Sequence, residues 1–256
     1  MHNIRLTIQY DGTRYLGWQR PAKSGAQKSI SYKIAEVLRK TTGEEVLLRT
    51  GAKTEPGVHA LAQTVSFETE SSLSPGEFLS VLNRYLPADI AVLSASAAPE
   101  RFRADLNALS RTYEYRICCS RVYDVFRMKY EACLFPGPDI SAMEEAAEYL
   151  RGRHDFRAFS DARKKAGTEK TITGISFHSA DSRLSIRITA DDFLSRMPRH
   201  VIGTLLDAGY HRLVPEDIPE LLAGKSLPGK QTGELFTPKA LLLTDIQYPQ
   251  NISPAI

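Results

Sequence analysis

The sequence predicts an α+β protein built from two βαββαβ halves, each with a mainly antiparallel sheet. Short runs in which apolar and polar residues alternate are typical of half-buried strands, and they are interspersed with runs at helical spacing. The same order of elements occurs twice along the 256 residues, which is long enough for two domains of ordinary size. With 42% apolar and 25% charged residues, the composition is that of an ordinary globular protein.

The first half begins with a strand, because Ile4, Leu6, Ile8 and Tyr10 alternate with polar residues. The remaining elements expected in this half are a helix with apolar residues at helical spacing over 30–38, strands around 45–50 and 62–68, a helix that begins at a capping box of Ser74 and Glu77, and a strand from Ile90.

The second half repeats this order, and we place the boundary near Asn107, which gives domains 1–107 and 108–256. Its expected elements are a strand at 113–117, a helix over 141–150, strands near 171–178 and 183–190, helices near 195–209 and 216–223, and a last strand at 240–248. Two βαββαβ domains of this kind are expected to be ferredoxin-like. With helices on one face of each sheet, the other faces are free to form a central cleft.

Other sequence features exclude several classes of protein. Cys118, Cys119 and Cys133 are odd in number and match neither a disulfide framework nor the spacing of a zinc site, so we expect reduced thiols and no metal. The chain enters its first strand without a charged and then apolar leader, and no apolar run approaches the length of a membrane span. We therefore expect a cytoplasmic protein that does not interact with membranes.

The most informative stretch is the turn at 51–60, between apolar alternating runs at 46–48 and 64–67. Pro56 and Gly57 require a sharp bend there, and Glu55 lies at its apex, two residues after Lys53. A carboxylate on a strained loop beside a cation is typical of a nucleophile or a base. The alternative is a surface turn with a solvated glutamate.

Two further stretches have the composition of RNA-binding segments. The turn at 10–19 carries aromatic residues and a cation, so Arg14, Trp18 and Gln19 are candidates to contact bases and phosphates; the alternative is a packed turn anchored by Trp18. Residues 151–170 hold seven Lys or Arg against three acids, although the whole chain carries only +3. This local excess, with Lys164, Lys165 and Lys170, predicts an RNA-binding loop; the alternative is a solvated loop.

Several segments over 4–249 resemble the tRNA pseudouridine synthase A (TruA) family. The turn Gly51-Ala-Lys-Thr-Glu-Pro-Gly-Val-His-Ala60 is similar to the family's Gly-Arg-Thr-Asp-Ala-Gly-Val-His-Ala. The other similar segments are Tyr10 to Gln19, Asn83 to Ile90, Arg111-Thr-Tyr-Glu-Tyr115, His154-Asp-Phe-Arg-Ala-Phe159 and Phe193-Leu-Ser-Arg-Met-Pro-Arg-His200.

The resemblance implies an enzyme that isomerises uridine to pseudouridine in the anticodon arm of tRNA. It also implies that no metal or organic cofactor is needed, and that a homodimer holds one tRNA across two subunits. In the family, a carboxylate acts as nucleophile or base, and Glu55 takes its position. Tyr113 would pack on the target uracil and exchange protons, Arg199 would pair with Glu55, and Lys53 would hold the flipped nucleotide open. His59 and Arg111 lie within the matched motifs and are expected to contact the substrate.

The chain departs from the family pattern at the residues closest to the chemistry. Lys53, Glu55 and Pro56 replace the family's Arg, Asp and Ala, and Arg103 and Asp105 replace its His and Arg. A carboxylate at position 105 would repel RNA phosphates. These changes leave a second hypothesis open, which is a catalytically inactive paralogue that binds or remodels RNA.

Overall fold

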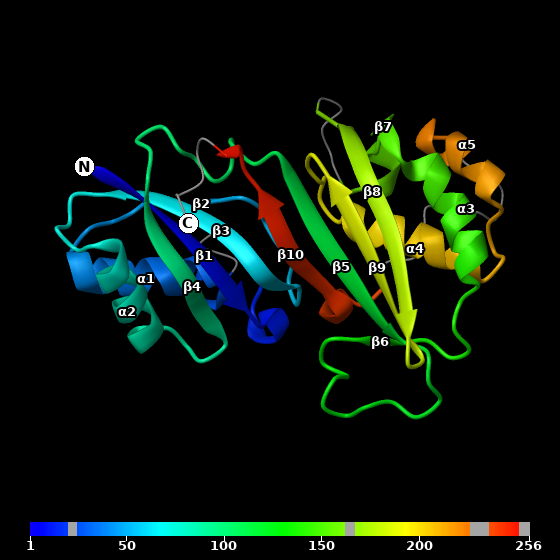
Figure 1. Ribbon diagram of the computed structural model, residues 1–256, viewed down its shortest axis with the longest axis horizontal. Helices are drawn as coiled ribbons and strands as arrows, with labels where there is room; N and C mark the ends of the chain where they lie inside the picture. Colours follow the sequence, from blue (N-terminus) through cyan, green and yellow to red (C-terminus); the bar gives the residue numbers. More distant parts are fainter. Residues whose placement is uncertain (20–24, 162–166, 226–235, 251–256) are drawn as a thin grey trace. The chain divides into compact units, whose positions relative to one another are not determined.

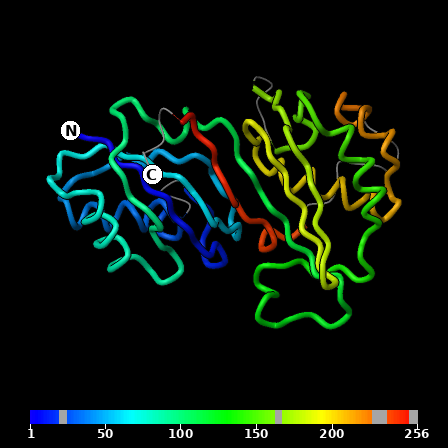
Figure 2. Tube along the Cα trace, viewed as in Figure 1, coloured from blue at the N-terminus to red at the C-terminus, as the bar shows by residue number. Residues whose placement is uncertain are grey.

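The computed structural model describes residues 1–19, 25–161, 167–225 and 236–250. The chain divides into two compact units, which are shown in Figure 1 and as a trace in Figure 2. Unit 1 consists of Met1–Arg111 together with Leu242–Ile256, and unit 2 consists of Thr112–Leu241. The last strand therefore groups with the first half of the chain, unlike the expected domain 108–256, because it pairs with a strand of unit 1.

Unit 1 contains both predicted helices and a sheet of mainly antiparallel strands. Its elements are β1 (His2–Tyr10), α1 (Ile30–Thr42), β2 (Arg49–Thr50), β3 (His59–Thr69), α2 (Pro75–Tyr85), β4 (Ile90–Ala98) and β10 (Leu241–Gln247). β1 lies between β4 and β3 and is antiparallel to both, and β2 is antiparallel to β3. β10 joins β3 in parallel, with Leu242 opposite His59.

The core of unit 1 lies between the sheet and its two helices. Ile4 of β1 is opposite Phe67 of β3, so the two side chains share one face of the sheet. Phe78 of α2 packs edge-on against Phe67, with ring centroids 5.4 Å apart. α1 lies beside α2, as Figure 1 shows. Both helices therefore cover the same face, as the sequence predicts, and Ser74 and Glu77 form the expected capping box of α2.

Unit 2 also consists of a sheet and helices. Its elements are β5 (Ser110–Cys118), β6 (Ala132–Cys133), α3 (Ile140–Leu150), β7 (Gly152–Asp155), β8 (Glu169–Ala180), β9 (Arg183–Ala190), α4 (Met197–Gly209) and α5 (Ile218–Leu222). The strands follow the order β5-β9-β8-β7; β8 is antiparallel to both neighbours, and the short β6 pairs with β5 in parallel.

The core of unit 2 is centred on α4, most of whose residues are buried. Ile175 of β8 and Ile188 of β9 are opposite each other and point into this core. α3 packs closely on α4 at Gly209, where an added Cβ would lie 2.7 Å from Cγ of Met143. Among the residues that the structure describes, no helix is both long and apolar enough to cross a membrane.

Candidate active site

The turn that carries Glu55 is a tight loop between β2 and β3 in unit 1. The backbone N–H of Val58 donates to the carbonyl of Glu55 at 3.2 Å, which closes the bend. Gly57 adopts a left-handed conformation with φ of 78°, which favours glycine. Thr54 and Val58 are buried on either side, whereas Glu55 is half-buried. The loop therefore holds one partly exposed carboxylate between two fixed neighbours.

The chain that follows β1 holds this loop through backbone hydrogen bonds on both sides of Glu55. The N–H of Trp18 donates to the carbonyl of Thr54 at 3.0 Å, and the N–H of Gly57 donates to the carbonyl of Tyr15 at 3.3 Å. Gly17 has φ of +88°, and an added Cβ would lie 2.6 Å from the Thr54 carbonyl oxygen. Only glycine allows the two segments to approach this closely.

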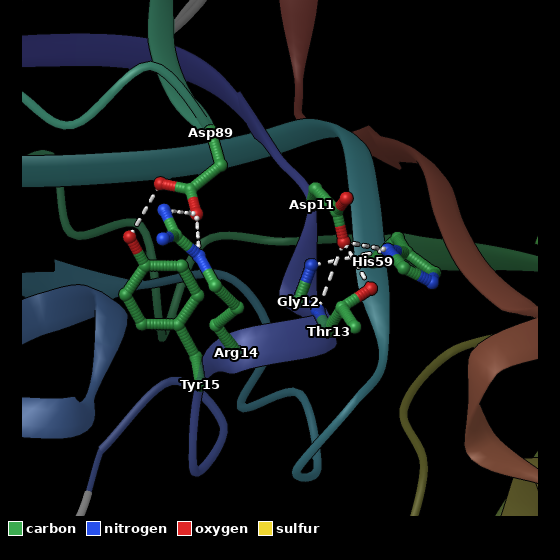
Figure 3. Close-up of polar contacts among 7 residues, drawn as sticks. All are labelled: Asp11, Gly12, Thr13, Arg14, Tyr15, His59 and Asp89. Carbon is green, nitrogen blue, oxygen red and sulfur yellow. Dashed lines mark hydrogen bonds and ion pairs between the residues drawn. The ribbon is translucent and has the colours of Figure 1, made fainter. Parts of the chain in front are cut away.

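His59 is buried, and its polar contacts with the turn that follows β1 are drawn in Figure 3. Its Nδ1 accepts a hydrogen bond from the N–H of Gly12 at 3.0 Å, and Oδ1 of Asp11 lies 3.2 Å from the same nitrogen. Asp11 also accepts from the N–H of Thr13 at 2.9 Å. With only 2% of its surface exposed, His59 braces the turn in this structure. Direct contact with a substrate, expected from the sequence, stays a prediction for this residue.

Arg14 forms an ion pair at the outer side of the turn, which is also drawn in Figure 3. Its Nε and Nη2 donate to Oδ2 of Asp89 at 2.9 and 2.5 Å, and the hydroxyl of Tyr15 donates to Oδ1 of the same carboxylate at 2.6 Å. The Arg14 side chain is nevertheless 73% exposed. A role in contacting RNA stays a prediction for this residue, and for the exposed Gln19.

Trp18 is an anchor of the packed turn. It is 1% exposed, and its ring centroid lies 6.4 Å from that of Tyr10. A ring buried to this extent cannot stack on a base, so the structure favours the alternative interpretation of this motif. The motif is aromatic because it has to fill space between the first strand and the loop that carries Glu55.

The role of Trp18 can be checked by fluorescence, because it is the only tryptophan of the chain. We expect blue-shifted emission, weak quenching by acrylamide and no further quenching on addition of tRNA. We also expect Trp18→Ala to lower the free energy of unfolding by about 3–5 kcal/mol, as measured by urea denaturation. Strong quenching by bound tRNA would instead indicate that the ring stacks on RNA.

Two other predicted contact residues of unit 1 differ in their surroundings. Arg111 is 7% exposed, and its Nε donates to the carbonyl of Gly51 at 2.9 Å, so it supports the base of the loop. Lys53 is exposed and makes no side-chain hydrogen bond or ion pair with any residue that the structure describes. Its ammonium group is therefore available to a ligand near Glu55.

Arg103 and Asp105, the two residues that depart from the family pattern after α2, form an ion pair with each other. Nη2 of Arg103 lies 2.7 Å from Oδ2 of Asp105, and Nε donates to Oδ1 at 3.2 Å. Burial by itself would raise the pKa of Asp105, but Arg103 holds it below its ordinary value. The two substitutions neutralise each other, so the expected repulsion of phosphates by Asp105 is offset locally.

In unit 2, Tyr113 and Tyr115 of β5 point to the same face of their strand, as two residues at i and i+2 must. Tyr113 is 6% exposed and packs edge-on against Phe193, with ring centroids 5.2 Å apart. Tyr115 is fully buried, and its hydroxyl donates to the carbonyl of Thr237 at 3.1 Å. Burial raises the pKa of Tyr115, and the nearby Arg199 opposes that rise.

Arg199 lies in the first turn of α4. Its Nε donates to the carbonyl of Phe236 at 2.7 Å, and Nη2 contacts the same oxygen. Pro198 is tolerated there because the first turn of a helix has no hydrogen-bond partner for that backbone nitrogen. Glu55 belongs to unit 1, whereas Tyr113 and Arg199 belong to unit 2. The predicted pairing of Arg199 with Glu55 therefore stays a prediction.

The described cations of the basic stretch at 151–170 are paired with acids. Arg151 pairs with Glu148, Arg153 with Glu169, Arg157 with Asp155, and Lys170 with Asp192, at 2.6, 2.7, 3.6 and 2.8 Å. Lys164 and Lys165 lie outside the described residues. Residues 163–165 therefore carry three of the four excess positive charges of this stretch, and Lys170 forms an ion pair with Asp192, which follows β9.

Reasoning from the sequence missed a set of polar side chains behind the loop. Gln63 is fully buried on β3, and Tyr10 at the end of β1 bonds to the side chain of Thr54. The alternating pattern of the first strand places Tyr10 on its apolar face and does not reveal this bond. The one signal in the sequence was Gln63 itself, since an amide in an apolar strand must find hydrogen-bond partners.

The chain is similar to known proteins over nearly its whole length. Residues 146–249 match the family model described as tRNA pseudouridine synthase. A protein from Caldicellulosiruptor bescii named tRNA pseudouridine synthase A is 38% identical over 250 residues, which cover 97% of this chain and 100% of that protein. A protein from Clostridium tetani named tRNA pseudouridine synthase A 2 is 37% identical, over 87% of this chain and 90% of that protein. A protein of the same name from Clostridium perfringens is 35% identical, over 97% of this chain and 100% of that protein. The similarity includes both units.

Proposed function

Because the chain belongs to the tRNA pseudouridine synthase A family, we propose that it isomerises uridine to pseudouridine in tRNA, with Glu55 as the catalytic carboxylate. One observation supports Glu55 above all. Hydrogen bonds from Trp18 and to Tyr15 fix the backbone on both sides of it, while Glu55 itself stays partly exposed. A carboxylate held in this way needs little reorganisation to meet a substrate.

The reaction exchanges one bond for another on the same ribose. The bond between N1 of the uracil and C1′ breaks, the base rotates, and C5 becomes joined to C1′. C5 then loses its hydrogen to solvent, and N1 gains a proton. No atom is oxidised or reduced, so a carboxylate that attacks C1′ or removes a proton, together with a proton-transfer partner, accounts for the chemistry.

The other catalytic roles follow from the family motifs. Tyr113 is proposed to pack on the uracil and to exchange protons, and Arg199 to pair with and orient the carboxylate of Glu55. The target uridine must leave its stack to reach such a group. The exposed ammonium group of Lys53, which has no partner among the described residues, is proposed to hold the flipped nucleotide open.

The RNA is proposed to be recognised through its anticodon arm, by a homodimer in the cytoplasm. We further propose that the units are two ferredoxin-like domains whose sheets form a central RNA-binding cleft. The strand order of unit 1, β4-β1-β3 with β2 on the outer edge of β3, supports this assignment. Its pairs β4/β1, β1/β3 and β3/β2 are antiparallel, as such a domain requires.

The alternative of an inactive RNA-binding paralogue rests on Glu55 in place of the family's Asp. Glu reaches further by one carbon–carbon bond, and a misplacement of about 1 Å can lower a rate on the order of 10²-fold. Pro56 fixes the backbone dihedral next to Glu55 and thereby changes where its side chain begins. The fixed loop and the available Lys53 favour the enzyme.

The proposal is tested with tRNA transcribed with uridine tritiated at C5. We expect the wild-type protein to release tritium to water in proportion to the pseudouridine formed, without added metal or organic cofactor. A protein that retards tRNA on a native gel but releases no label would establish the binding function in place of catalysis. Mapping the modified position by mass spectrometry tests the anticodon arm as the target.

A further inference from the structure

A buried network of polar side chains lies behind the loop that carries Glu55. It is made of Tyr10 at the end of β1, Thr54 in the loop and Gln63 on β3. These three residues are 4%, 6% and 0% exposed. A buried polar group is costly unless its hydrogen bonds are made, so the pattern of bonds in this network is informative.

Gln63 clamps the loop at Ala52. Its Oε1 accepts from the N–H of Ala52 at 3.2 Å, and its Nε2 donates to the carbonyl of the same residue at 2.7 Å. The side-chain amide thus makes the two bonds that a neighbouring strand would otherwise make. The amide orientation is also determined, because turning it over would bring its NH₂ group against the N–H of Ala52.

The same amide is linked to Thr54 through the hydroxyl of Tyr10. The remaining hydrogen of Nε2 points to the hydroxyl oxygen of Tyr10 at 3.4 Å. The hydroxyl of Tyr10 also shares a hydrogen bond with Oγ1 of Thr54 at 2.7 Å, in which either hydroxyl can be the donor. Burial raises the pKa of Tyr10 to about 12, so its hydroxyl stays protonated throughout the neutral pH range.

Thr54 immediately precedes Glu55, and it is held at two points. Its carbonyl accepts from the N–H of Trp18, and its side chain is bonded to Tyr10. We propose that Tyr10 and Gln63 are positioning residues, whose network fixes Ala52 and Thr54 and so determines how far the carboxylate of Glu55 reaches into the site. This inference rests on the proposed function of Glu55, and it adds two residues that do not touch the substrate.

The test removes hydrogen bonds of the network with substitutions of nearly equal shape. Tyr10→Phe removes the hydroxyl, Thr54→Val removes its partner, and Gln63→Met removes both bonds to Ala52. In single-turnover tritium release, we expect the rate to fall about 10-fold for Tyr10→Phe and for Thr54→Val, because a slightly misplaced reacting group loses rate on this order. We expect a larger fall for Gln63→Met. KM for tRNA should stay within about twofold, because the loop displacement affects the reacting carboxylate and not the grip on RNA.

A matched control is Thr69→Val. Thr69 is also buried, lies at the end of β3 that is far from the Glu55 loop, and donates its hydroxyl hydrogen to Glu44 at 2.7 Å. We expect it to lower the thermal midpoint about as much as Thr54→Val does and to keep the wild-type rate. The double variant Tyr10→Phe/Thr54→Val should be no slower than Tyr10→Phe, since that single variant already removes the bond between Tyr10 and Thr54.

The outcomes separate this proposal from the function on which it rests. A wild-type protein that releases no tritium would overturn both. An active wild type, with Tyr10→Phe at full rate or with losses that multiply in the double variant, would overturn the positioning role alone. A fall in rate for Thr69→Val as large as that for Thr54→Val would also overturn it, because the effect would then follow stability.

Discussion

Glu55→Gln lowers the rate of tritium release from C5 by about 10³-fold, the middle of the range expected for removal of a general base or its equivalent. The amide has the size of the carboxylate, so the loop keeps its shape, but it can neither attack C1′ nor take up a proton. We expect the affinity for tRNA, measured by gel retardation, and the thermal midpoint to remain close to those of the wild type. Single-turnover assays measure the loss without interference from product release.

Two further variants make this result specific. Glu100→Gln removes another exposed glutamate of unit 1 and should retain the wild-type rate. Glu55→Asp restores the family's residue but draws the carboxylate back by about 1.5 Å, so a loop shaped for glutamate should lose on the order of 10²-fold in rate. If Glu55→Asp were active and the wild type inactive, Glu55 would occupy the catalytic position without supporting turnover.

Local patterns were sufficient to predict most of the secondary structure. The capping box at Ser74 and Glu77 begins α2 as expected, because its two hydrogen bonds depend only on residues close in sequence. The strand expected at 45–50 is shorter, since only Arg49–Thr50 pairs with β3. At this end of β3 the carboxylate of Glu44 accepts from the hydroxyl of Thr69 and from the N–H of Glu70, so a side chain and not a neighbouring strand uses that backbone N–H.

The candidate site was predicted less completely, because burial depends on contacts far apart in the sequence. The motif at 10–19 drew attention to an aromatic residue and a cation, but not to the fact that Trp18 lies under the loop while Arg14 faces outward. The same limit applies to His59. The motif predicts a contact with the substrate, but it does not predict the hydrogen bond that His59 accepts from the N–H of Gly12. What the motif did locate correctly is the sharp bend at Gly57.

A substitution at Gly12 should disrupt the loop from the opposite side. An added Cβ at Gly12 would lie 2.0 Å from the carbonyl oxygen of Val58, and this is a clash with backbone that cannot rotate away. We expect Gly12→Ala to lower the free energy of unfolding by about 3 kcal/mol, at the upper end of the cost of overpacking. Because Val58 also closes the bend at Glu55, the folded fraction should lose on the order of 10²-fold in rate.

Gly76→Ala is the matched control for this prediction, since an added Cβ there meets no atom within 4 Å and the residue lies in α2. Alanine in a helix should stabilise the protein by about 0.5 kcal/mol and leave the rate of isomerisation unchanged. Urea denaturation of both variants, followed by tritium release at a temperature where each is folded, measures the two effects separately. Wild-type stability and rate for Gly12→Ala would mean that the close approach of Gly12 to Val58 does not support the loop that carries Glu55.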